Sequence, residues 1–305
     1  MSSRHVPVLL DEVLRWLRPA AGSVLVDLTL GGAGYSSALL ERGARVIAFD
    51  RDPRAIAGAR QRLASHGAAF TARQAPFADF AQVLDELRIE KVDGICMDLG
   101  LSSDQLDDSE RGFGFRHEGE LDLRFDPGHG ESAQQLLRRI DVVALQSLLE
   151  KFGEVHRARS IARALKQLSG NIDVGSVREA VRAQLPGSER PEPELARVFQ
   201  ALRIAVNDEL GQLDAALEAI PDRLNAGGRF VAVSYHSLED RRVKQMLRRE
   251  SGMDRPRGRH IPQLETETPP RMRLLTRRAI AASEAELSRN PRARSAKLRA
   301  GERLP

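Results

Sequence analysis

Cysteine is nearly absent from this chain of 305 residues, in which Cys96 is the only one. That count excludes both a disulfide framework and a C-x-x-C metal site. Cys96 lies within the apolar run VDGICMD, where a buried, unreactive thiol is favoured over a nucleophile. We therefore expect neither a metal site nor cysteine-based catalysis.

Long hydrophobic runs are absent as well. No apolar stretch approaches the roughly 20 residues that a membrane-spanning helix needs. Charges and prolines interrupt the first residues, MSSRHVPVLLDEVLRWLRP, which argues against a signal peptide. With 41% hydrophobic residues the chain still has enough apolar side chains for a sizeable core. We expect a globular protein that acts in the cytoplasm and does not bind membranes.

The dinucleotide-binding pattern G-x-G-x-x-G is incomplete in the stretch that most resembles it, residues 23–52. This stretch contains an apolar run ending in Asp27, the glycine-rich turn LGGAG, a helical pattern, and a second apolar run ending in Asp50. Glycines let a backbone approach a ligand closely, and an acid at the end of the second strand can accept both hydroxyl hydrogens of a ribose. The stretch indicates a nucleoside site, although the same glycines also suit a plain tight turn.

Two details decide which nucleoside fits this stretch better. Ser37 stands where a dehydrogenase pattern requires its third glycine, which disfavours a nicotinamide cofactor. Asp27, just before the turn, is more typical of methyltransferases that use S-adenosylmethionine, whose pattern is D-x-G-x-G-x-G. Thr29 and Ala33 replace two of those glycines, so the match is partial.

Strand and helix patterns alternate through the first hundred residues. Such alternation is typical of a parallel sheet with helices on both faces. Asp27, Asp50 and Asp98 would then meet in one crevice at the carboxyl ends of three strands, although each alone is also the usual residue for capping a helix. Beyond residues 23–52, the predicted helices and strands cover residues 7–17, 53–63, 69–72, 77–87 and 92–99.

The alternation stops after the fourth strand. Residues 104–132 are polar and rich in glycine, and a connection of this length is expected to be functional or ordered by a ligand. The stretch PGSERPEP at 186–193 is typical of a linker. We predict a helical domain at 104–193, inserted into a domain made of residues 1–103 and 194–305. The other predicted elements are helices at 133–139, 142–152, 155–168, 174–185 and 195–224 and strands at 230–235 and 272–280.

Positive charge is concentrated at the C-terminal end. Residues 241–305 contain 18 Lys and Arg against 7 Asp and Glu, whereas residues 1–240 contain 29 against 36. Most of these cations are arginines, which bind phosphate through two parallel hydrogen bonds, so a nucleic-acid backbone is a natural partner. A solvated basic tail, starting at about residue 271, is the alternative.

Four separated motifs carry a resemblance to a known family. They are DLGLSS at 98–103, QLDD-x-x-RGF at 105–113, SYHSLEDRRVK at 234–244 and NPRARSAKLR at 290–299. Together with HVPVLLDEV at 5–13, they resemble the MraW family of ribosomal RNA small-subunit methyltransferases. The resemblance implies a Rossmann-like class I methyltransferase fold with an inserted all-helical domain.

The same resemblance implies an activity and its partners. The reaction is transfer of a methyl group from S-adenosylmethionine to N4 of a cytidine in the decoding region of small-subunit ribosomal RNA. The implied partner is that RNA, within an assembled or assembling 30S subunit. Ala33 and Tyr35 depart from the family's usual Gly-Gly-His, although backbone contacts survive both changes. The implied cofactor-binding residues are Ala33, Gly34, Tyr35, Asp50, Phe77, Asp98 and Gln105.

Catalytic candidates follow from what methyl transfer to a cytosine amine requires. The amine lone pair is delocalised into the ring, so acceptors aimed at its hydrogens favour the nucleophilic form. This chain lacks the S/D-P-P-Y motif of DNA amino-methyltransferases, and Asp98 and Ser102 of DLGLSS occupy the equivalent place. Asp98 serves either this purpose or cofactor binding alone. His236 is a further candidate that either contacts the base or orients the chain through a backbone carbonyl.

Two other functions remain open from the sequence. One is methylation of another nucleic acid. The other is a non-catalytic role in RNA binding or ribosome assembly on a methyltransferase fold, which the presence of Asp50, Asp98 and Gln105 opposes.

Overall fold

The protein is described by a computed structural model that covers residues 7–185, 187, 190–254 and 269–305. The chain forms two compact units, Met1–Gly100 with Gly211–Pro305, and Leu101–Leu210. An inserted domain was predicted, but its second boundary lies at 210/211 and not at 193/194. The reason is α10 (Glu192–Asn207), which buries its apolar side chains in the helical unit.

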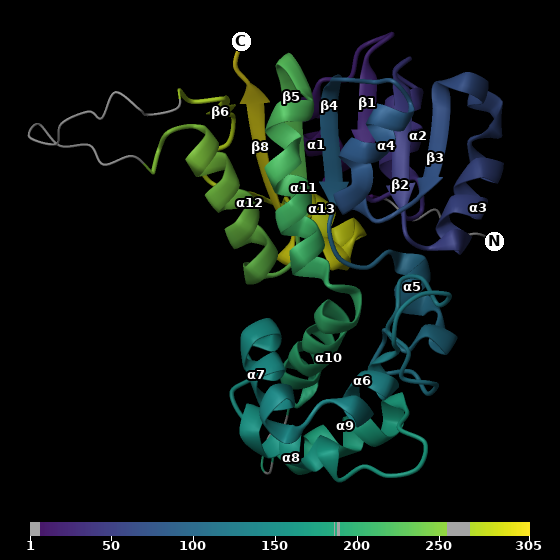
Figure 1. The fold of residues 1–305 in the computed structure, drawn as a ribbon, viewed down its shortest axis with the longest axis vertical. Helices are drawn as coiled ribbons and strands as arrows, with labels where there is room; N and C mark the ends of the chain where they lie inside the picture. Colours follow the sequence, from purple (N-terminus) through teal and green to yellow (C-terminus); the bar gives the residue numbers. More distant parts are fainter. Residues whose placement is uncertain (1–6, 186, 188–189, 255–268) are drawn as a thin grey trace, which may run out of the picture. The chain divides into compact units, whose positions relative to one another are not determined.

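The first unit is built on one sheet of eight described strands, in the order β3-β2-β1-β4-β5-β8-β6 with β7 paired to β8 (Figure 1). The strands from β1 to β5 are parallel to one another, and β8 runs antiparallel to both β5 and β6. This is a Rossmann-like arrangement with one reversed strand. The strands are β1 (Val24–Asp27), β2 (Arg45–Asp50), β3 (Phe70–Gln74), β4 (Val92–Asp98), β5 (Leu224–Ser234), β6 (Met272–Leu274), β7 (Ile280–Ala281) and β8 (Lys297–Arg303).

Helices bury apolar side chains against both faces of this sheet. Leu39 and Ile56 belong to the core on one face, and Leu84, Leu217 and Met246 belong to the core on the other. The predicted alternation of strands and helices is thereby confirmed. The helices of this unit are α1 (Leu10–Leu17), α2 (Gly34–Leu40), α3 (Pro53–Arg62), α4 (Phe80–Glu86), α11 (Glu209–Arg223), α12 (Ser237–Glu250) and α13 (Glu284–Arg289), with 3-10 turns η1 (Ala64–Ala69), η2 (Phe77–Asp79) and η4 (Pro291–Ser295).

The last residues form the strands β6, β7 and β8, where the sequence predicted one strand at 272–280 and left a solvated basic tail open as the alternative. β8 lies inside the sheet, where Leu298 and Ala300 are buried. Two of its charges are neutralised within the fold, since Arg299 Nε donates to Asp240 Oδ1 at 2.6 Å and Glu302 Oε2 accepts from Arg229 at 2.8 Å. The alternative of a solvated tail was wrong because these partners lie far away in the sequence.

The second unit is helical and has its own core. Its helices are α5 (Ser103–Asp107), α6 (Ala133–Arg139), α7 (Val142–Gly153), α8 (Ala158–Lys166), α9 (Val174–Ala183) and α10, with the 3-10 turn η3 (Ser109–Arg111). The predicted long helix at 195–224 is broken at Asp208, which has a left-handed φ of 49°. The polar connection at 104–132 is ordered by this unit's own side chains: Arg111 donates to the carbonyl of Phe125 at 2.7 Å, and Asn207 accepts from the Phe125 N–H at 2.8 Å.

Candidate active site

Three carboxylates lie at one edge of the sheet, as the sequence predicted. Asp27 of β1 pairs with Ala48 of β2 and with Cys96 of β4. Asp50 and Asp98 each come two residues after these partners, so both lie just beyond Asp27 at the carboxyl ends of their strands. Asp27 is fully buried, and it accepts from Ser36 Oγ at 2.7 Å and from the Thr29 N–H at 3.2 Å. It therefore stabilises the turn after β1 and is not presented to a ligand.

Asp50 is partly buried at the end of β2. Its Oδ2 accepts from the Gly31 N–H at 2.8 Å, and its Oδ1 accepts from the Asp52 N–H at 2.9 Å. Burial raises the pKa of Asp50 to about 6, although both hydrogen bonds oppose that shift. The carboxylate is thus held in a fixed orientation with one lone pair left on each oxygen, which suits a pair of ribose hydroxyls.

Ala33, Gly34 and Tyr35, which follow the turn after β1, each have a separate role in the packing of the protein. Ala33 is buried and left-handed, with φ 61° and ψ 24°, a conformation that glycine adopts without strain. A Cβ on Gly34 would lie 2.1 Å from Cγ of Pro7, so glycine is required there for the N-terminal segment to pack. The Tyr35 hydroxyl donates to the Val8 carbonyl at 2.5 Å, and its ring is in the core. The three side-chain positions are thus explained by the protein's own packing, and their cofactor contacts stay predictions.

Asp98 forms a hydrogen bond to a residue that was not among the predicted site residues. The Tyr235 hydroxyl donates to Asp98 Oδ1 at 2.8 Å, and the Asp98 N–H donates to Thr29 Oγ1 at 2.6 Å. Burial raises the pKa of Asp98 to about 7, and the Tyr235 hydrogen bond opposes that shift. Tyr235 could have been found from the register, because Val233 pairs with Asp98 and Tyr235 is two residues further on.

His236 is at the N-terminus of α12, next to Tyr235. Its Nε2 lies 3.1 Å from Glu239 Oε1, and the Glu239 carboxylate also accepts from the Tyr235 N–H at 2.9 Å. Among the described residues, no backbone carbonyl accepts a hydrogen bond from the imidazole. The described residues therefore do not contain the predicted alternative, a hydrogen bond from His236 to a backbone carbonyl that orients the chain.

The remaining predicted residues belong to other elements. Phe77 begins η2, directly after β3, and its partly buried ring packs against the core that contains Phe80. Ser102 and Gln105 belong to the helical unit, where they cap α5 reciprocally: Ser102 Oγ accepts from the Gln105 N–H at 3.2 Å, and Gln105 Oε1 accepts from the Ser102 N–H at 3.0 Å. The functional roles of all three stay predictions.

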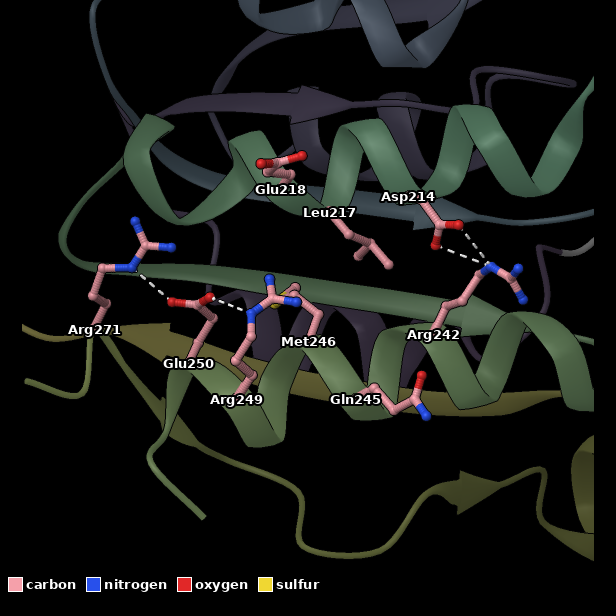
Figure 2. A pocket seen from close by; sticks show the side chains of 9 residues that line it. All are labelled: Asp214, Leu217, Glu218, Arg242, Gln245, Met246, Arg249, Glu250 and Arg271. Atoms are coloured by element: carbon pink, nitrogen blue, oxygen red, sulfur yellow. Dashed lines mark hydrogen bonds and ion pairs between the residues drawn. The ribbon is translucent and has the colours of Figure 1, made fainter. Parts of the chain in front are cut away.

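A pocket between α11 and α12 of the first unit is lined by none of these residues. Its walls come from α11 and α12, with Arg271 at one end (Figure 2). The charged side chains around it are paired with one another: Arg242 Nε lies 2.9 Å from Asp214, and Glu250 lies 3.0 Å from Arg249 and 2.6 Å from Arg271. This pocket is therefore not a candidate for the predicted chemistry. In the described residues we find no cluster of three potential metal ligands and no helix long and apolar enough to span a membrane.

Comparison with solved structures finds weak likeness to methyltransferases. An rRNA methylase from Streptococcus thermophilus shares 13% identity at a TM-score of 0.43, with 100% of this chain and 99% of that one covered. The N-methyltransferase NodS from Bradyrhizobium japonicum shares 11% identity at a TM-score of 0.44, with 97% and 94% covered.

Comparison of sequences is far more specific. The Ribosomal RNA small subunit methyltransferase H of Anaeromyxobacter dehalogenans is 47% identical over 99% of this chain and 98% of its own length. The proteins of the same name from Methylobacterium nodulans and Nitratidesulfovibrio vulgaris are 44% and 43% identical over 98% of this chain, and over 90% and 95% of their own lengths. The model of the MraW methylase family matches residues 2–304. With its Rossmann-like sheet and inserted helical unit, the chain belongs to the MraW methylase family.

Proposed function

We propose that this protein transfers a methyl group from S-adenosylmethionine to N4 of a cytidine in the decoding region of small-subunit ribosomal RNA. The observation that carries the proposal is the partly buried Asp98 carboxylate, which Tyr235 orients at the end of β4. We place the reaction in the cytoplasm, on an assembled or assembling 30S subunit.

The acids at the sheet edge fit the cofactor chemically. Asp50 and Asp98 both have pKa values raised by burial, and no arginine or lysine is among the groups that lower them. A ligand that adds positive charge and hydroxyl donors would stabilise both as carboxylates. S-adenosylmethionine has those groups, and when bound it supplies a methyl group activated by a sulfonium centre.

The residues of the chain then have separate tasks. Asp50, fixed by two backbone N–H groups, accepts from the ribose hydroxyls. Asp98 keeps Oδ2 for an amine hydrogen of the target base, because Oδ1 is already bonded to the Tyr235 hydroxyl. An acceptor aimed at the amine favours its nucleophilic form, and alignment of the two reacting atoms supplies most of the remaining acceleration. His236 lies next to this pair and is the second residue that we propose contacts the base.

Labelled S-adenosylmethionine, incubated with small subunits or naked RNA and followed by nucleoside analysis, tests the proposal. We expect label in N4-methylcytidine, and label at any other position would overturn the specific assignment. Asp98→Ala, Ser102→Ala and His236→Ala test the three catalytic candidates, with cofactor binding checked by titration. Asp85→Ala removes an exposed acid outside the site and is the control. Any candidate variant that binds the cofactor and keeps the unaltered rate is removed from the catalytic set.

The two alternative functions give other outcomes in the same experiments. A non-catalytic assembly factor would bind RNA without taking up cofactor or transferring label. An enzyme for another nucleic acid would bind cofactor, leave ribosomal RNA unlabelled and label that other substrate.

A further inference from the structure

Six exposed cations gather on the segment that leads into β8. We call them the cationic edge: Arg277, Arg278, Arg289, Arg292, Arg294 and Lys297. Within residues 277–297 the only acids are Glu284 and Glu286, and Glu286 Oε1 already accepts from the Leu9 N–H at 2.6 Å. The segment therefore exposes an excess of positive charge.

Four of these cations differ from their neighbours in having no acidic partner among the described residues. Arg271 and Arg299 form ion pairs with Glu250 and Asp240 at 2.6 Å, and these pairs hold the sheet and α12 together. By contrast, no carboxylate in the described part of the chain forms an ion pair with any member of a set of four arginines, which are Arg277, Arg278, Arg289 and Arg294. Lys297 lies 4.0 Å from Asp240 and is half exposed. The pairs of Arg271 and Arg299 stabilise the fold, whereas the four arginines of that set remain available to a partner.

The 3-10 turn η4 holds two of these arginines in place. Ala293 is fully buried, and its N–H donates to the Asn290 carbonyl at 3.0 Å. Arg292 and Arg294, on either side of Ala293, are exposed. Because the backbone between them is anchored in the core, less conformational entropy is lost when a ligand binds here than on a disordered tail.

The cationic edge also ends beside the candidate active site. Lys297 pairs with Ser234 at the last step of the β5–β8 register, and the next residue of β5's chain is Tyr235. The Tyr235 hydroxyl is bonded to Asp98. One strand register therefore connects the last residue of the cationic edge, Lys297, to Asp98, the proposed acceptor of the target amine.

We infer that the cationic edge binds the phosphates of the RNA strand whose cytidine reaches Asp98. This inference rests on the proposed function, and it adds that residues of the first unit contact the RNA strand along its backbone. Guanidinium groups suit phosphate because they donate two parallel hydrogen bonds. An anionic membrane is disfavoured, since among the described residues the exposed large hydrophobic side chains are Val143 and Met253, neither of which lies in this segment.

The test compares two triple variants of the full chain. In the first, Arg278→Gln, Arg289→Gln and Arg294→Gln neutralise three arginines of the cationic edge. In the control, Arg18→Gln, Arg42→Gln and Arg45→Gln remove the same charge from exposed arginines elsewhere in the unit. Affinity for a naked small-subunit RNA fragment is measured across a salt series, and cofactor affinity is measured separately.

We expect the first variant to lose at least tenfold in RNA affinity at low salt. The slope of log affinity against log salt should become shallower by about 2, since each lost contact with a single strand changes it by about 0.7. Cofactor affinity should be unchanged, and the control should keep most of its RNA affinity.

Two results would overturn the inference and leave the proposed function intact: equal RNA affinity in both variants, or binding of phosphatidylserine vesicles by the unaltered protein as tight as its RNA binding. Failure of the unaltered protein to methylate ribosomal RNA would instead refute the proposed function itself.

Discussion

Tyr235→Phe removes one hydroxyl and leaves the aromatic ring in place. In the structure that hydroxyl is the only side-chain donor to Asp98 among the described residues, at 2.8 Å from Oδ1. The pKa of Asp98 is already raised to about 7 by burial. We predict that the substitution raises it further, because the ionised carboxylate loses the hydrogen bond that favours it.

The size of the shift follows from the strength of that bond. A hydrogen bond to a charged group contributes about 1.5–3 kcal/mol, and one pKa unit corresponds to about 1.4 kcal/mol, so the shift should be about one to two units. At pH 7 the ionised fraction of Asp98 would fall from about one half to between about 1% and 10%. With the cofactor bound, whose positive charge lowers the pKa of Asp98, a shift of one to two units should reduce the rate about 10- to 100-fold in the acid limb if the carboxylate is the acceptor of the target amine, and the rate should recover once the pH exceeds the shifted pKa.

Two measurements check this prediction. The first is the pH profile of methyl transfer at saturating cofactor, in which the acid limb should move to higher pH while the rate at high pH stays close to that of the unaltered protein. The second is carboxyl NMR of the cofactor-free protein, which reads the titration of Asp98 without any activity. Asp98→Asn, which has no titrating carboxylate, should show no such limb. An unmoved acid limb in Tyr235→Phe, or a rate loss that persists at pH 9, would refute the reasoning.

Three further changes test the turn and the ribose acceptor. Asp50→Asn should abolish cofactor binding, and it should cost stability because its amide NH2 faces one of the two backbone N–H groups that Asp50 accepts. That cost should be smaller at pH 8 than at pH 4 by about 2 kcal/mol, because an Asp50 pKa raised from 3.8 to about 6 makes the stability of the unaltered protein fall as pH rises between those values; thermal unfolding at pH 4 and 8 checks the sign, and equal changes at both pH values would contradict it. Ala33→Gly should raise the free energy of unfolding by up to about 1 kcal/mol by relieving a left-handed φ, whereas Ala38→Gly within α2 should lower it by at least about 1 kcal/mol. Gly34→Ala should lower it by about 1–3 kcal/mol through overlap with Pro7, and Pro7→Ala in the same chain should restore part of that loss in a double-mutant cycle.

The part of the fold that local patterns determine could be predicted from the sequence. The strands ending in Asp27, Asp50 and Asp98 follow from short apolar runs with acids at their ends, and alternation with helices gave the parallel sheet. The position of the acids at one edge then follows from topology alone, since parallel strands end together. These inferences needed no contact between distant residues.

The parts that could not be predicted depend on distant partners. β8 reads as a charged tail because nothing near it in the sequence shows that Asp240 and Arg229 will neutralise Arg299 and Glu302. α10 was assigned to the wrong unit because its amphipathic pattern does not say which core receives its apolar face. Tyr235 was missed as a partner of Asp98 because their pairing requires the β4–β5 register.

Three aspartates at equivalent strand ends differ mainly in how many donors the fold already supplies to them. Asp27 accepts from a hydroxyl and a backbone N–H and is fully buried, so it has little capacity for a ligand. Asp50 accepts one backbone N–H on each oxygen, which leaves a matched pair of lone pairs for a diol. Asp98 accepts only the Tyr235 hydroxyl among the described residues. Burial raises the pKa of Asp98 to about 7 and that of Asp50 to about 6. The acid with the fewest donors gains most from a new one, and this is why the amine of the target base is assigned to Asp98.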